Sequence, residues 1–420
     1  KWGNKKSERF LMKMIIGALA IYFASSVFSA EKCPKVDFSS CPKGFVCKDR
    51  PIIKGKQFEK VFRNLKKEEY EKPWKVYKIV DQTKTTKFFK AMRNLSKSFK
   101  KKMIEVKKRL KKYETSKVPM NSFTKDSFSH AESMAIQSFN QSNDKEVILK
   151  GIKNVTKKRV TLVYEDDNGK MSKTKFYIYS KINKTKEKRP VLLIMPPVYG
   201  ISPFDLGMAF EYASLGFDVS ILELGGLSFV SPFQKISTLK KTMKRVLGDT
   251  HRMVQYFVQK RNADPKNFGI FGFSLGGLMA SMVYNLNDNI TYLSLAMGGG
   301  NFPEIFTNSK QAMAKLYRSY RMREEKIKTK KEYFNMIEKA LPYDPLSFAH
   351  RKNPDNVFFV FSAGDTLVPS KNQWDLSRAY KASCEKGNVR WEKHQHFIAI
   401  VQDLLKRNQL RKFFVSKMMK

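Results

Sequence analysis

The chain has 420 residues, of which 42% are hydrophobic, so it can bury a large core and is not a disordered polypeptide. This length predicts one large domain with an appendage, or two domains. Lys and Arg number 81 against 38 Asp and Glu, and the formal net charge of +43 favours anionic surroundings such as acidic lipid head groups or envelope polymers.

Most of the positive charge comes from Lys. The planar guanidinium group of Arg binds phosphate groups more specifically than the ammonium group of Lys does. This composition therefore argues against nucleic acid as a partner. A solvated basic surface without any dedicated partner is the other interpretation of the charge.

Residues 1–30 have the layout of a secretory signal peptide. Basic residues up to Lys13 precede an apolar run at positions 14–24, and small residues follow at positions 25, 26, 29 and 30. We therefore expect cleavage after Ser29 or Ala30 and an exported protein, periplasmic or secreted. The alternative is an uncleaved segment that anchors the chain, because the apolar run is only somewhat shorter than a membrane-spanning helix.

Three of the four cysteines, Cys33, Cys41 and Cys47, follow this segment directly, whereas Cys384 lies near the other end of the chain. In an oxidising compartment they could form one or two disulfide bonds, whose pairing the sequence does not fix. No Cys-x-x-Cys pair or nearby histidine completes a zinc site.

Residues 31–144 are expected to form a basic, largely helical N-terminal region. Apolar residues recur at three- and four-residue steps within positions 88–110, which predicts a helix with one apolar stripe and lysine-rich faces. Such a helix either packs on the rest of the protein or lies on an anionic membrane surface. Positions 119–144 are rich in Ser, Asn and Gln and are typical of a connector.

A second domain is expected over residues 145–420. Two alternating runs, 159–164 and 175–179, flank a turn sequence at 166–169 and predict a β-hairpin. Short apolar strands are then predicted at 191–195, 217–222, 268–271, 291–296, 357–361 and 389–391. Helices are predicted between them at 204–214 and 240–261, and from 398 onward. This alternation predicts an α/β fold with a mostly parallel sheet covered by helices on both faces.

A basic, helix-favouring insertion at residues 302–349 interrupts the alternation and is a candidate cap over a site.

The motif GFSLGG at residues 272–277 lies between a predicted strand and a predicted helix. A serine between glycines on such a turn is typical of a nucleophile elbow, where larger side chains would collide with the strand or the helix. The amides at the helix N-terminus would favour the negative charge of a tetrahedral intermediate. Ser274 is therefore the candidate nucleophile.

A serine nucleophile needs a base and a group that orients the base. Only five histidines are present, and His394 and His396 lie between the last predicted strand and the last predicted helix. Asp365 lies in the loop that follows the preceding strand. Asp344 is a rival acid, but it precedes a strand and stands before Pro345, so we expect it to cap a turn.

With these motifs, residues 145–415 resemble the α/β-hydrolase superfamily. The matching elements are the elbow, the acid turn GDTLVP at 364–369, and His396 followed by Phe397. The resemblance implies that Ser274 is the nucleophile, Asp365 the orienting acid and His396 the base. His394 is then a neighbour of the site.

The resemblance also implies an oxyanion hole. One donor is the amide of Leu275, and the other lies in the loop after residues 191–195. Pro196 and Pro197 have no amide hydrogen, so that donor is Val198 or Tyr199. The paired prolines are similar to the corresponding loop of polyhydroxyalkanoate synthases, but those enzymes have cysteine at the elbow, and Ser274 favours hydrolysis of acyl esters.

The sequence thus predicts an exported serine esterase or lipase-like hydrolase that forms an acyl-enzyme on small-molecule or lipid esters and needs no cofactor or metal. One alternative is a catalytically silent module of the same fold that binds anionic membrane or envelope surfaces. Another is an acyl hydrolase related to polyhydroxyalkanoate metabolism. No phosphate-binding glycine loop of the Walker or dinucleotide type is present in the sequence.

Overall fold

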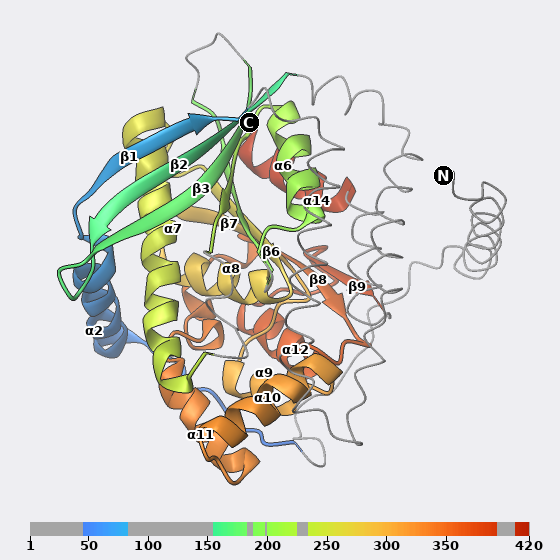
Figure 1. The fold of residues 1–420 in the computed structure, drawn as a ribbon. Coiled ribbons are helices and arrows are strands. Elements are labelled where there is room, and N and C mark those ends of the chain that lie inside the picture. The colour runs from blue at the N-terminus through green and yellow to red at the C-terminus, as the bar shows by residue number, and fades with distance from the viewer. Residues whose placement is uncertain are drawn as a thin grey trace, which may run out of the picture. The chain divides into compact units, whose positions relative to one another are not determined.

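The computed structural model describes residues 45–82, 154–182, 188–197, 200–224, 234–392 and 408–419. Within them a nine-stranded sheet has the order β1-β2-β3-β5-β4-β6-β7-β8-β9 (Figure 1). Strands β4 to β9 run parallel to one another, and β1, β2 and β3 form an antiparallel extension at one edge. The strands are β1 (Trp74–Asp81), β2 (Val155–Glu165), β3 (Met171–Lys181), β4 (Val191–Met195), β5 (Asp218–Leu222), β6 (Phe268–Phe273), β7 (Ile290–Ala296), β8 (Val357–Ser362) and β9 (Val389–Glu392).

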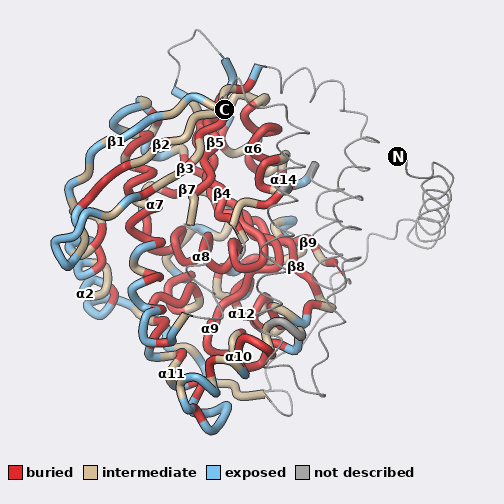
Figure 2. The backbone as a smooth tube through the Cα atoms, in the orientation of Figure 1, coloured by how far each residue is buried: buried red, intermediate tan, exposed pale blue. Residues whose placement is uncertain are grey.

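The central strands are buried along their whole length. Every residue of β4, β6 and β8 is buried, as expected for parallel strands that are covered on both faces (Figure 2). Side chains alternate along β4, so that Leu193 belongs to one hydrophobic cluster and Leu192 and Ile194 belong to the other. The sheet therefore separates two cores.

Helices cover both faces of the sheet. The cluster that contains Leu193 also holds side chains of α7 (Leu239–Arg261), α8 (Leu275–Leu286) and α12 (Ser370–Ala379). The cluster on the other face holds side chains of α6 (Pro203–Leu215) and α14 (Asn408–Met418). The predicted fold class, a mostly parallel sheet with helices on both faces, is confirmed.

The predicted hairpin is present, and the predicted insertion is helical. β2 pairs with β3 along its whole length, and the turn between them places Gly169 at φ 71°. The insertion contains α9 (Phe302–Asn308), α10 (Ala312–Glu324) and α11 (Lys330–Ala340). Its function as a cap stays a prediction.

The N-terminal part that is described, residues 45–82, is joined to this sheet. It contains α2 (Gly55–Leu65), the short π-helix η1 (Lys66–Tyr70) and β1. Within residues 31–144, which are predicted to be largely helical, β1 is instead extended because it pairs antiparallel with β2. The boundary near residue 145 stays a prediction. Residues 1–30, the connector and the striped helix at 88–110 lie outside the described residues, and no described helix is long and apolar enough to cross a membrane.

A fully buried arginine on α7 holds this N-terminal part in place. Arg252 is 0% exposed, and its Nη2 lies 3.0 Å from Asp249 Oδ1 and 3.6 Å from Glu69 Oε2. Its Nη1 donates to the Glu69 carbonyl at 3.1 Å, and its Nε donates to Thr174 Oγ1 at 3.1 Å. Its guanidinium also lies 3.5 Å from the centre of the Tyr164 ring. Arg252 thus joins η1, β2, β3 and α7.

Replacing Arg252 by Met should lower the free energy of unfolding by about 3–5 kcal/mol, because two buried carboxylates would lose their shared cation. Urea denaturation followed by circular dichroism would measure the change. Arg245→Met is the matched control, since Arg245 lies 3.4 Å from the same Asp249 but is 52% exposed, and we expect a loss below about 1 kcal/mol. Equal losses in the two variants would contradict the role of Arg252.

Candidate active site

Ser274 lies at the sharp turn between β6 and α8. Its backbone has φ 54° and ψ −126°, a conformation that residues other than glycine rarely adopt. The Ser274 amide donates to the Ala296 carbonyl at 2.9 Å, and the Ser274 carbonyl accepts from Leu278 at 3.0 Å as α8 begins. The strained turn is therefore fixed on both sides, and the side chain is 8% exposed.

The glycines around Ser274 are required by close backbone contacts. A Cβ atom on Gly272 would lie 2.2 Å from the Gly276 carbonyl oxygen, and one on Gly276 would lie 2.2 Å from the Met195 carbonyl oxygen. Backbone atoms cannot give way to such contacts as the end of a side chain can. The first turn of α8 thus lies directly against the end of β4, which is the geometry expected for a nucleophile elbow.

Gly276→Ala should displace the first turn of α8 and cost several kcal/mol of stability, or leave a folded protein whose Ser274 no longer reacts, because a methyl group cannot fit against Met195. Thermal unfolding and labelling by a fluorophosphonate would measure both effects. Gly207→Ala in α6 is the control, since a Cβ there meets no atom within 4 Å. A Gly276→Ala protein with the stability and labelling of Gly207→Ala would contradict this reading of the turn.

The loop that should supply the second oxyanion donor begins beside this contact. Gly200 has φ 88° and donates its amide to the Pro197 carbonyl at 3.0 Å. Val198 and Tyr199, the two predicted donors, lie outside the described residues. Leu275 is the first residue of α8, where amide hydrogens have no acceptor within the helix. The Leu275 amide is therefore suited to donate a hydrogen bond to an oxyanion.

Asp365 lies in the loop after β8, and both of its carboxylate oxygens accept hydrogen bonds from described residues. Its Oδ1 accepts from the Leu367 amide at 2.8 Å and from the Val368 amide at 3.0 Å, and its Oδ2 accepts from Gln373 Nε2 at 2.8 Å. The side chain is only 5% exposed. Hydrogen bonds of this kind are strengthened by the charge of a carboxylate and fix its orientation.

The sheet places Ser274 and Asp365 at the same edge. Strands β6, β7 and β8 are parallel neighbours, so Ser274 and Asp365 follow carboxyl ends of strands whose axes are roughly 10 Å apart. The next parallel strand, β9, ends at Glu392, four residues before His396. His394 and His396 lie outside the described residues. Their roles, like the triad as a whole, stay predictions.

Asp344 acts as a structural cap, as expected. Its Oδ1 accepts from the amides of Asn301 and Leu346 at 2.9 and 3.0 Å, and its Oδ2 accepts from the Phe302 amide. Arg50 Nη2 lies 3.5 Å from Asp344 Oδ2 and forms an ion pair with this buried carboxylate. Asp344 therefore holds the start of α9 and a neighbouring 3₁₀ turn.

Asp205 and Glu304 are buried carboxyl groups that were not selected from the sequence. Asp205 forms a capping box with Ser202 at the start of α6, and burial raises its pKa to about 7. Glu304 in α9 accepts from Asn372 at 2.9 Å, and burial raises its pKa to about 7, although Lys371 opposes the shift. The capping box could have been recognised from its spacing, whereas Glu304 carries no such signal.

Of the two described histidines, His251 is partly buried and His350 is exposed. His251 stacks on Tyr70 with ring centres 4.1 Å apart, and burial lowers its pKa to about 4. Burial, aided by Lys54 and Arg351, also lowers the pKa of His350. His130 lies outside the described residues, and among those that are described no group of three His, Cys, Asp or Glu side chains could hold a metal ion.

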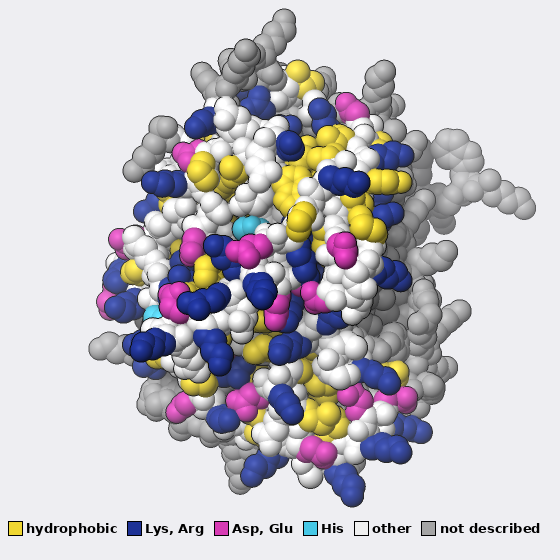
Figure 3. Space-filling view, turned by 90° about the vertical axis from the view of Figure 1, so that its left-hand side faces the viewer, with side chains coloured by type: hydrophobic (Ala, Val, Ile, Leu, Met, Phe, Trp, Pro, Cys, Tyr) yellow, Lys and Arg dark blue, Asp and Glu magenta, His cyan; other side chains and the backbone are white. Residues whose placement is uncertain are grey.

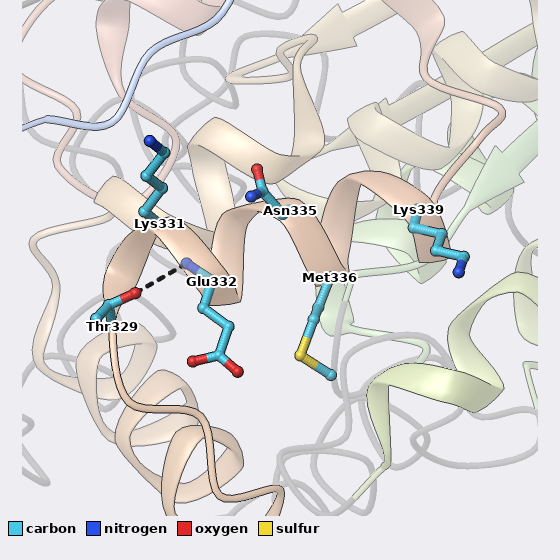
Figure 4. A pocket seen from close by; sticks show the side chains of 6 residues that line it. All are labelled: Thr329, Lys331, Glu332, Asn335, Met336 and Lys339. Atoms are coloured by element: carbon cyan, nitrogen blue, oxygen red, sulfur yellow. Dashed lines mark hydrogen bonds between the residues drawn. The ribbon is translucent and has the colours of Figure 1, made fainter.

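A surface hollow of about 450 Å³ lies along α11, in the insertion (Figure 4). Its lining consists of Thr329, Lys331, Glu332, Asn335, Met336 and Lys339. The Thr329 hydroxyl accepts from the Glu332 amide at 3.1 Å and caps the helix. None of the predicted catalytic residues lines this hollow, so it is separate from the candidate site.

Residues 209–402 match the model of the prolyl oligopeptidase family. This range runs from α6 to beyond β9 and includes Ser274, Asp365 and His396. Comparison with curated proteins finds no match.

Solved structures with similar folds include esterases and peptidases. The acetyl xylan esterase from Paenibacillus sp. R4 is 13% identical over 69% of this chain and 95% of its own, with a TM-score of 0.48. The Pyrococcus horikoshii acylaminoacyl peptidase is 15% identical over 66% of this chain and 44% of its own, with a TM-score of 0.48. A puromycin-hydrolyzing peptidase from Mycobacterium tuberculosis is 12% identical over 63% of this chain and 46% of its own, with a TM-score of 0.41.

Proposed function

We propose that this chain is an exported serine hydrolase of the α/β-hydrolase superfamily that cleaves carboxylic esters, because residues 209–402 match the prolyl oligopeptidase family model and the sheet is mostly parallel. The observation that carries the proposal is the strained turn at Ser274, which is packed by glycines against β4 at the edge of the sheet where Asp365 also lies. A serine in this conformation presents its hydroxyl beyond the strand end, beside the first amides of α8. Such a turn costs stability and is typical of functional sites.

In the proposed reaction, Ser274 Oγ attacks the ester carbonyl while His396 takes its proton. The amides of Leu275 and of Val198 or Tyr199 bind the oxyanion, and the positive end of the α8 dipole adds to this stabilisation. His396 then gives the proton to the leaving alcohol, and an acyl-enzyme remains. Water, deprotonated by His396, releases the acid, while Asp365 holds the imidazole in the required tautomer.

Peptide bonds are the second candidate substrate, because the matching family model is that of the prolyl oligopeptidase family. The same triad can cleave esters and amides, and the two differ chiefly in the leaving group that His396 must protonate. Relative rates on p-nitrophenyl acyl esters and on p-nitroanilides of short peptides would separate the candidates.

We propose export on the sequence of residues 1–30, with an uncleaved membrane anchor as the alternative. Cys47 and Cys384 both lie in disulfide bonds, which supports an oxidising compartment.

A binding role without catalysis is motivated by the net charge of +43. In the face shown in Figure 3, Lys and Arg side chains are spread over the surface with Asp and Glu side chains between them. Charges arranged in this way favour solubility over attachment to one anionic surface. We therefore place the enzyme first.

Replacing Ser274 by Ala should reduce kcat on a p-nitrophenyl ester by about 10⁴-fold or more, because the nucleophile is lost while the fold remains. A fluorophosphonate should label the natural protein at Ser274, as peptide mass spectrometry would show. An active Ser274→Ala protein would contradict the mechanism. An unlabelled natural protein that binds anionic vesicles in a salt-sensitive manner would instead favour the binding role.

The two acids should behave differently when each is replaced by Asn. We expect Asp365→Asn to lower the kcat of the folded protein by about 10³–10⁴-fold, whatever its effect on the melting temperature, because the imidazole would lose its orienting charge. Asp344→Asn should lower the melting temperature by several degrees and leave the activity of the folded protein nearly unchanged, since Asp344 caps helices and partners Arg50. The reverse pattern would assign the acid to Asp344.

A further inference from the structure

Gln373 lies in the first turn of α12 and bonds to the loop that carries Asp365. The side chain is 1% exposed. Its Nε2 donates to Asp365 Oδ2 and to the Val368 carbonyl, both at 2.8 Å, and its Oε1 accepts from the Ser362 amide at 3.0 Å. A single side chain therefore holds the beginning, the middle and the end of this loop.

These bonds allow only one orientation of the Gln373 amide. Nε2 has two hydrogens and faces two oxygen atoms, while Oε1 faces an N–H donor. A flipped amide would set Oε1 against those two oxygens and Nε2 against the Ser362 amide. Because the group is buried, no water could relieve the mismatch, and Gln373 must present a donor to Asp365.

The hydrogen bond from Gln373 also fixes the orientation of the Asp365 carboxylate. Each carboxylate oxygen can accept two hydrogen bonds, and Oδ1 of Asp365 accepts two backbone amides. Oδ2 accepts a hydrogen bond from Gln373 Nε2, so donors fix both oxygens of the carboxylate. The carboxylate cannot rotate without breaking the bonds to Leu367, Val368 and Gln373.

We propose that Gln373 is a positioning residue for the reaction, which fixes the carboxylate of Asp365 in one orientation and donates a hydrogen bond to its Oδ2. This role rests on the proposed function, since it has a catalytic effect only if Asp365 orients a base. Sequence patterns gave no reason to select a glutamine eight positions after the acid.

The test replaces Gln373 by Glu in the full chain, which keeps the shape and sets a second carboxyl group against Asp365. On a p-nitrophenyl ester we expect kcat to fall about 10- to 100-fold with KM changed less than about twofold, because the base is misplaced. The acid limb of the kcat/KM profile should move to higher pH, since added negative charge favours the imidazolium ion.

Gln373→Met is the second variant, which removes the donor without adding charge and avoids repulsion between two carboxylates. Its kcat should fall by a similar factor, and its acid limb should move in the same direction by a smaller amount. Asn372→Asp is the matched control in the same helical turn. Asn372 is buried and donates to Glu304 and to the Gly300 carbonyl, so this variant should lose stability without moving the acid limb.

Folded Gln373 variants with the natural kcat and pH profile would overturn the positioning role. It would also be overturned if Asn372→Asp moved the acid limb as far as Gln373→Glu does. If the natural protein is labelled at Ser274 and active, either result removes this inference alone. A natural protein whose Ser274 does not react would remove the proposed function and this inference together.

Discussion

The contact between Gly276 and the Met195 carbonyl is the constraint on which the candidate site depends. It sets the first turn of α8 against the end of β4, and the parallel pairing of Met195 with Gly272 keeps the two strand ends level. Three parts of the proposed chemistry are thereby brought together, namely the strained Ser274, the amide of Leu275 and the loop that leaves β4. A methyl group at position 276 would separate all three.

The central sheet and the elbow could be predicted from the sequence because in both cases the local environment dictates the residue types. Strands β4, β6 and β8 are covered on both faces, so they consist almost entirely of apolar residues and are easily recognised. The elbow requires glycine where backbones almost touch. Asp365 could be selected because the acid of this fold follows a strand, and its hydrogen bonds agree with that choice.

Other features depend on contacts between distant segments and left little trace in the sequence. β1 contains two lysines and forms a strand through its pairing with β2. Arg252 belongs to a helix rich in charged residues, and it is buried because η1 packs over it. Gln373 could equally have been a surface residue, since only the folded loop shows what its amide contacts. His394, His396 and the two candidates for the second oxyanion donor lie outside the described residues, and their roles stay predictions.

The attachment of residues 45–82 has a consequence for the order of folding. The Glu69 carbonyl and Arg252 are 183 positions apart, Val46 and Asn308 are 262 apart, and Arg50 and the Leu341 carbonyl are 291 apart. Residues 45–82 leave the ribosome before these partners and can therefore make the contacts only after most of the intervening chain has been synthesised. Such distant pairings form slowly and leave strand edges exposed in the meantime. Residues 45–82 are thus synthesised before their partners but take their final positions after them.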